Sequence, residues 1–202
     1  MLSERWEETW RGLDRTPPAG VVDFLLRAYD EPSRAYHTTQ HLEECFGHLD
    51  ACPVEPQHRG RLELALWFHD AVYETKASDN EARSAALART ELADLPETEL
   101  DEIEALILAT AHTSAPQAGD QQLLVDIDLA ILGASHERFE EYEVQVREEY
   151  RWVPGLLYRS GRRKILRGIL ARDSIYGTAH FRDSFELRAR ENLERSIAQL
   201  SS

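Results

Sequence analysis

The dipeptide His69-Asp70 is the feature of the sequence that most clearly suggests chemistry. It follows the apolar segment 62–68, which predicts a buried helix. An imidazole beside a carboxylate is costly to bury unless another group compensates both of them. A divalent metal ion can do so, because neutral imidazole nitrogen and carboxylate oxygen are both metal ligands. The pair is therefore a candidate metal site, although a helix end at which Asp70 binds local amides is the alternative.

Further candidate ligands lie elsewhere in the chain. His41 falls on the apolar side of a predicted helix, where a hydrogen-bonded core histidine is the alternative to a metal ligand. His37 lies one turn earlier, and we expect it to orient a ligand. Asp126 and Asp128 interrupt the apolar run 123–132, and a buried carboxylate needs a cation or donors. Because the two aspartates point about 200° apart on one helix, we expect only one of them to bind the ion. The other aspartate, Asp126 if Asp128 is the ligand, would support the site or accept a helix-start amide.

Helical periodicity runs through almost the whole sequence. Apolar residues recur at spacings of three and four, and no alternating stretch indicates a strand. Segments 78–81 and 98–101 have the form of a capping box at a helix start, and Gly133 is placed to end a helix. We predict an all-α fold that forms a single compact domain over residues 1–202. Its metal-site core would span about 29–172, with the N- and C-terminal helices packed on it.

Length and charge narrow the classes of function. A chain of 202 residues is the size of one domain and can bury a sizeable core without disulfides. With 23 Lys and Arg against 37 Asp and Glu, the net charge is −14, which argues against nucleic acid as a partner. Two cysteines make a disulfide framework improbable. The sequence has no apolar run long enough to cross a membrane, and we expect a cytoplasmic protein without a membrane partner.

Four stretches surround the candidate ligands: YHTTQH (36–41), WFHDAVY (67–73), DNE (79–81) and DIDLAILG (126–133). A histidine, then a His-Asp pair, then a distant aspartate resembles the HD superfamily of metal-dependent phosphohydrolases. The flanking residues resemble a bacterial branch of that superfamily, and the likeness covers most of the chain. It implies an all-helical HD-type fold. The metal ligands that it implies are His41, His69, Asp70 and Asp128.

The resemblance also implies a reaction. One divalent ion (Mn, Fe, Co, Ni, Zn or Mg) would activate a water that hydrolyses a phosphomonoester or a nucleotide. Asp70 could contact both the ion and the attacking water, while Glu81 or His112 would transfer protons. Glu81 also fits a helix cap, and His112 fits a polar helix end. Superfamily members with two metals carry additional histidines before the last aspartate, whereas this chain has only His112 there, which favours a single ion.

Three arginines are the candidate contacts to substrate: Arg34, Arg147 and Arg162. Guanidinium groups bind phosphate bidentately, although a solvated helix face is the more common role for such residues. The expected partner is a small phosphorylated molecule, and a homodimer is an ordinary expectation for a chain of this type. Two other functions stay open: a nucleotide-sensing HD module without turnover, and a di-iron oxygenase of the same fold.

Overall fold

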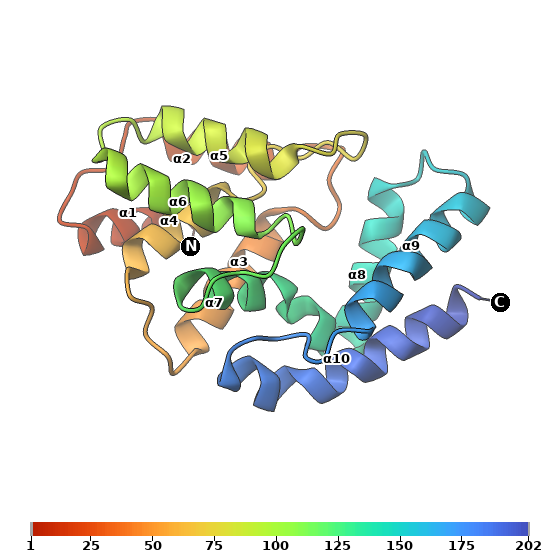
Figure 1. Ribbon diagram of the computed structural model, residues 1–202. Coiled ribbons are helices and arrows are strands. Elements are labelled where there is room, and N and C mark those ends of the chain that lie inside the picture. Colours follow the sequence, from red (N-terminus) through yellow and green to blue (C-terminus); the bar gives the residue numbers. More distant parts are fainter. Residues whose placement is uncertain (1, 202) are drawn as a thin grey trace. The chain divides into compact units, whose positions relative to one another are not determined.

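Helices are the only regular secondary structure over residues 2–201, the part of the chain that its computed structural model describes (Figure 1). No strand occurs among these residues, and the prediction of an all-α fold is confirmed. Two compact units follow one another along the chain, the first ending at Val125 and the second beginning at Asp126. None of the helices within 2–201 combines the length and the apolar character that a membrane span requires.

Seven helices begin within the first unit: α1 (Leu2–Gly12), α2 (Val21–Tyr29), α3 (Thr39–Ala51), α4 (Arg59–Phe68), α5 (Asn80–Glu91), α6 (Glu97–Ala109) and α7 (Asp120–Asp128). Helix α4 is the centre of this unit, because α1, α3, α5 and α6 all pack against it. Every residue from Leu62 to Phe68 is buried. A helix surrounded by others must be largely apolar on all sides, which explains the apolar run that precedes His69 and that only Glu63 interrupts.

The N-terminal helix contributes an aromatic cluster to this core. The ring of Trp6 meets the ring of Trp67 edge to face, with centroids 5.3 Å apart, and lies 5.6 Å from the ring of Trp10. Edge-to-face aromatic pairs add to the free energy gained from burial. Helix α1 is thereby fixed to α4, the helix that leads into the His-Asp pair.

A glutamate lies within the largely apolar centre of the first unit. Glu63 of α4 is buried, and Thr9 donates a hydrogen bond of 2.7 Å to its carboxylate. Arg5 and Arg59 donate to the same carboxylate at 2.8 and 3.0 Å, and both also bind Asp50. A buried charge is tolerated only when it is paired and hydrogen-bonded. This network of α1, α3 and α4 satisfies that condition.

The second unit contains the 3-10 helix η1 (Leu129–Gly133) and the helices α8 (His136–Glu149), α9 (Gly155–Leu170) and α10 (Ala179–Gln199). Both α8 and α10 contact η1, and α9 packs on α10. The phenol of Tyr176 donates to the carbonyl of Leu129, and the amide of Asn192 donates to the carbonyl of Leu132. These bonds satisfy carbonyl oxygens that the short η1 turn leaves free.

The two predicted capping boxes are wrong. Helix α5 begins one residue later than expected, with Asp79 rather than Ser78 before it, and α6 follows Pro96. Neither start has a side-chain cap hydrogen bond. The side-chain amide of Asn80 instead makes two hydrogen bonds of 3.0 Å with the backbone of Glu74: its oxygen accepts from the Glu74 N–H, and its nitrogen donates to the Glu74 carbonyl. At the start of α5, this contact with the preceding loop takes the place of the predicted side-chain cap. A capping box is a local preference that such contacts can outweigh.

Gly133 has a different role from the one predicted. It is the last residue of η1, not a left-handed residue beyond a helix end. A methyl group at this position would lie 2.7 Å from the Cβ atom and 2.8 Å from the carbonyl oxygen of Phe185 in α10. The absence of a side chain therefore allows α10 to approach η1 closely.

Gly133→Ala is therefore expected to destabilise the protein by about 1–3 kcal/mol, the usual range for overpacking. Urea unfolding followed by circular dichroism measures the change. Gly161→Ala is the matched control, because a Cβ atom there would meet nothing within 4 Å. Alanine in the middle of α9 should raise stability by up to ~1 kcal/mol. Equal effects of the two substitutions would contradict the close packing at Gly133.

Candidate metal centre

Helix α3 positions the first histidine. The hydroxyl of Thr38 caps this helix by accepting a hydrogen bond from the amide of Gln40 at 3.3 Å. His41 lies in the first turn with only 2% of its surface exposed, and Cys45 follows one turn later on the same face. The capped start thus fixes the imidazole of His41 in the interior of the first unit.

The end of α4 positions the second histidine and the aspartate. His69 is the C-terminal cap residue of α4 and is 1% exposed. Its Nδ1 atom lies 2.8 Å from the carbonyl oxygen of Leu66, so Nδ1 carries the proton that this bond requires. The lone pair of a neutral His69 is then on Nε2. A backbone carbonyl on the other ring nitrogen is the usual arrangement behind a metal-binding histidine.

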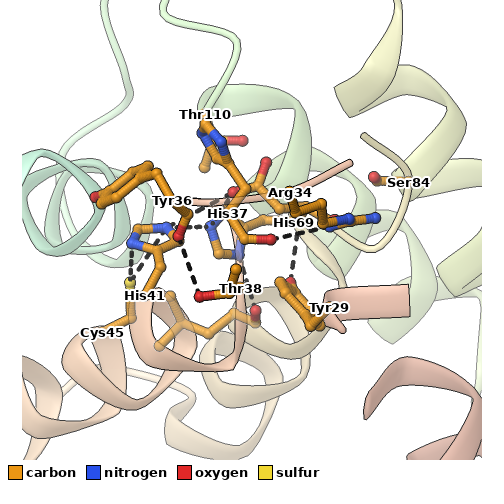
Figure 2. A network of polar contacts seen from close by, with 12 residues as sticks. Tyr29, Arg34, Tyr36, His37, Thr38, His41, Cys45, His69, Ser84 and Thr110 are labelled. Carbon is orange, nitrogen blue, oxygen red and sulfur yellow. Dashed lines mark hydrogen bonds and ion pairs between the residues drawn. The ribbon is translucent and has the colours of Figure 1, made fainter. Parts of the chain in front are cut away.

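Three potential ligand atoms converge at this point, and Figure 2 shows the rings of His41 and His69 next to each other. The two Nε2 atoms are 3.1 Å apart. The Oδ2 atom of Asp70 lies 3.1 Å from Nε2 of His69 and 3.6 Å from Nε2 of His41. Ligand atoms that share one ion at roughly 2.0–2.2 Å are themselves separated by about 3–3.5 Å. The triangle formed by His41, His69 and Asp70 matches this spacing.

Protonation offers another explanation of these short distances. In neutral His69 the lone pair on Nε2 faces the carboxylate oxygen of Asp70 at 3.1 Å, and the two acceptors repel each other. A doubly protonated His69 removes the repulsion, but its single Nε2 proton must then serve both Asp70 and His41. A cation at the centre of the triangle attracts all three atoms at once, which makes it the simpler match to the geometry.

Cys45 was not among the residues that the sequence suggested, yet its sulfur lies within 4.8 Å of ligand atoms of both histidines. Figure 2 shows it beside His41. The sulfur is 3.7 Å from Nε2 and 3.8 Å from Nδ1 of that ring. A thiolate that shared an ion with Nε2 would lie at least ~1 Å farther from Nδ1, given metal distances of about 2.1 Å to nitrogen and 2.3 Å to sulfur. Asp70 therefore fits the third ligand position better than Cys45.

The surrounding histidines keep the carboxyl group of Asp70 ionised. Burial alone would raise the pKa of this carboxyl group, whose side chain is 14% exposed. The imidazoles of His69, His37 and His41 act in the opposite direction and lower the pKa well below its ordinary value. Asp70 is thus a carboxylate at neutral pH, the form that binds a metal ion.

Arg34 supports the backbone around the pair. Its side chain is buried, and the guanidinium donates to the carbonyls of Asp70 at 2.5 Å, Ala71 at 3.0 Å and His37 at 3.3 Å. Its Nε atom donates to Glu31 at 3.2 Å. These bonds join the segment before α3 to the segment after α4. They favour a positioning role for Arg34, and its contact with substrate stays a prediction.

Aromatic side chains complete the surroundings of the triangle. The ring of His37 stacks on Tyr73 with centroids 3.9 Å apart and lies 6.0 Å from the ring of His41. The hydroxyl of Tyr29 donates to the carbonyl of Trp67 and accepts from the amide of Asp70. Neither Tyr29 nor Tyr73 was expected here, since single tyrosines are ordinary partly buried residues of a fold.

The two predicted proton-transfer residues lie on different elements of the first unit. Glu81 is half-buried in the first turn of α5, and its side chain has no hydrogen bond or ion pair within residues 2–201. Ser84, in the next turn of α5, bonds the backbone of Val72 beyond Asp70. His112 follows α6 with φ at +52°, in the left-handed region. Non-glycine residues there often belong to functional sites. Their roles in catalysis stay predictions.

Asp126 and Asp128 belong to the second unit. Asp126 is fully buried and accepts bonds from the amides of Gly177 and Thr178 at 2.9 and 2.6 Å and from the Thr178 hydroxyl at 2.7 Å. It thereby anchors the start of α10, the helix-start contact that was one of its two expected roles. Asp128 ends α7 and is half-buried. Its ligation of the metal stays a prediction.

The other two predicted substrate arginines are engaged within the second unit. Arg147 donates to the carbonyls of Tyr150 and Val153 at 2.7 and 3.1 Å. Arg162 binds Glu143 at 2.5 Å and lies over the ring of Tyr142. These contacts hold both side chains against their own unit. Binding of substrate by Arg147 and Arg162 stays a prediction.

Comparison of the chain with protein-family models, with curated proteins and with solved structures finds no match. The resemblance to the HD superfamily therefore rests on the motifs of the sequence, and the chemistry of the site rests on its geometry.

Proposed function

We propose that this protein is a metal-dependent phosphohydrolase whose single divalent ion is held by His41, His69 and Asp70, with Asp128 as a further ligand. The observation that carries the proposal is the triangle of two Nε2 atoms and one Oδ2 atom, separated by 3.1 to 3.6 Å. Both histidines are buried, and Asp70 is ionised. Mixed nitrogen and oxygen ligands suit Mn, Fe, Co, Ni or Zn, and Mg belongs to the candidates.

A bound divalent ion would supply a water of lowered pKa and would neutralise charge on phosphoryl oxygens. The chain's own residues have supporting roles. His69 keeps its Nε2 lone pair available because Nδ1 is occupied by the Leu66 carbonyl. Asp70 can accept a hydrogen bond from the attacking water through its second oxygen. Glu81, a carboxylate without a partner among the described residues, and His112 are the candidates to accept or return a proton.

A phosphomonoester or nucleotide is the substrate class within this proposal, and the cytoplasm is the proposed compartment. A homodimer and the absence of nucleic-acid or membrane partners belong to the same proposal. Two alternatives differ in measurable ways. A sensing module would bind a nucleotide without turnover. A di-iron oxygenase would hold two irons, which the single histidine between Asp70 and Asp128 disfavours.

The test is phosphate release by purified protein that has been stripped with chelator and reloaded with one metal at a time. A panel of sugar phosphates, nucleotides and p-nitrophenyl phosphate serves as substrate. We expect turnover only after reloading, and Asp70→Asn should lose it, because the amide cannot supply the negative charge that offsets the ion. Nucleotide binding without any phosphate release by the wild type, with unchanged affinity in Asp70→Asn, would overturn the hydrolase and favour the sensing module.

A further inference from the structure

The second unit carries a strongly cationic segment in an acidic protein. Between Tyr150 and Arg172 the sequence has no Asp or Glu, although the whole chain has a net charge of −14. The seven cations of this segment are Arg151, Arg159, Arg162, Arg163, Lys164, Arg167 and Arg172. Most of them lie on α9, of which only Leu166 is fully buried. Such a separation of charge creates a local field that attracts anions.

Side chains of α8, α9 and α10 line a groove in the second unit. Its volume is about 1080 Å³, near the upper end of the range for small-molecule sites. Phe139, Val144, Leu156 and Leu200 supply apolar walls. Val144 and Leu156 are 69% and 74% exposed. Two large aliphatic side chains exposed along one groove suit an apolar ligand better than water.

Two of the three glutamates that line the groove are paired with arginines. Glu143 accepts from Arg162 at 2.5 Å and from the hydroxyl of Ser196 at 2.7 Å. Glu148 binds Arg151 at 2.6 Å. The third, Glu140, lies 3.1 Å from the imidazole of His136. The negative charges of Glu143 and Glu148 are therefore offset by arginines of the unit itself.

Three arginines of the groove, in contrast, have no carboxylate partner among residues 2–201. Arg147 donates to backbone carbonyls, and Arg195 donates to the amide oxygen of Asn192 at 2.8 Å. Arg159 is exposed and has no hydrogen bond or ion pair in the described part of the chain. A neutral acceptor leaves the charge of a guanidinium in place, so the groove has an excess of positive charge. This excess lies directly beside its apolar walls.

Tyr158 adds an unsatisfied donor to the same lining. Its ring lies under the guanidinium of Arg147, with 4.5 Å between the guanidinium carbon and the ring centroid. Its buried hydroxyl has no hydrogen-bond partner among the described residues. Burial raises the pKa of this phenol to about 12, so it retains its proton at neutral pH. A buried donor without an acceptor is uncommon and costly in a native protein.

We propose that this groove binds a soluble single-chain anionic amphiphile, with an alkyl or acyl chain and a carboxylate or phosphate head. The apolar walls between Val144 and Leu156 would cover the chain, and Arg159 with Arg195 would bind the head through charge-assisted hydrogen bonds. Nucleic acid is a poor alternative, because the exposed apolar side chains of the groove, Val144 and Leu156, are aliphatic and offer no stacking surface, and the chain as a whole is acidic. None of the residues that line the groove is among the proposed metal ligands, and the proposal does not depend on the metal.

Dodecyl phosphate below its micellar concentration is the probe, and isothermal titration calorimetry with the full-length protein is the measurement. We expect saturable binding of one molecule per chain. Dodecyltrimethylammonium has the same chain with the opposite charge, and inorganic phosphate has the head without the chain. Each should bind at least about tenfold more weakly, since tenfold corresponds to the loss of 1.4 kcal/mol.

Two exposed substitutions test the site without affecting the core. Arg159→Gln removes a cation from the groove, and Leu156→Ser removes an apolar wall; each should weaken binding of dodecyl phosphate about tenfold. Lys164→Gln is the control, because it removes the same charge from α9 at a position that does not line the groove. Equal weakening by Lys164→Gln and Arg159→Gln would overturn the proposal in favour of unspecific attraction to the cationic segment.

Phosphatidylglycerol vesicles distinguish a free amphiphile from a lipid surface. We expect titratable binding of dodecyl phosphate and no sedimentation of the protein with vesicles. Sedimentation with vesicles in the absence of binding to the monomeric amphiphile would overturn the proposal and would identify α9 as a membrane-surface helix. Absence of binding to both probes would also overturn it.

Discussion

Replacement of His69 by alanine is expected to reduce the metal content of the purified protein from about one ion per chain to nearly none. The imidazole supplies one of the three atoms that converge within 3.6 Å, and its loss leaves only His41 and Asp70 of this triangle to support binding by the further ligand Asp128. Affinity for the metal ion should fall by more than the roughly 10–100-fold that follows removal of a residue that only hydrogen-bonds a metal ligand. Elemental analysis of both proteins, purified identically without chelator, measures the result.

Two control variants sharpen this test. His136→Ala removes a half-exposed histidine of α8 that pairs with Glu140, and it should leave the metal content unchanged. Cys45→Ser should also retain the ion, because the position of the sulfur does not fit a ligand of His41 Nε2. Loss of the metal in Cys45→Ser but not in Asp70→Asn would replace the proposed triangle by the set His41, Cys45 and His69. The absence of metal from wild type, even after reconstitution, would contradict any metal centre.

Replacement of Glu63 by alanine should destabilise the first unit by about 3–5 kcal/mol, the range found when one partner of a buried ion pair is removed. The carboxylate accepts three hydrogen bonds within the core. Without it, the hydroxyl of Thr9 loses its acceptor, and two guanidiniums retain only Asp50 or other exposed carboxylates. Few domains have more than ~15 kcal/mol of stability, so urea unfolding should show a large shift in midpoint.

Glu102→Ala is the appropriate comparison for Glu63→Ala. It also removes a glutamate that binds an arginine, Arg61, but the side chain of Glu102 is 47% exposed. Exposed pairs contribute about 0–1 kcal/mol, and the midpoint should barely move. Similar shifts for the two variants would show that burial does not determine the strength of the Glu63 network.

The all-helical class and the approximate positions of helices could be predicted from the sequence, because hydrophobic periodicity is a property of each segment by itself. The apolar run 62–68 predicted a buried helix, and α4 is that helix. Helix ends were less predictable. The capping-box patterns at 78–81 and 98–101 failed, since Asn80 binds the loop at Glu74 and α6 begins directly after Pro96. Local capping preferences amount to about 1 kcal/mol, which contacts outside the helix can outweigh.

The sequence by itself predicted a kind of chemistry for this protein, metal binding by imidazole and carboxylate groups. The residue types His41, His69 and Asp70, set beside apolar helix segments, favour a metal ion because buried imidazole and carboxylate require compensation. Their distances could not be predicted, because residues 28 positions apart meet only after α3 packs on α4. The burial of Glu63 and the anchoring of α10 by Asp126 are likewise products of tertiary packing. The packing of helices determines which side chains distant in sequence come into contact, and local sequence patterns do not specify that packing.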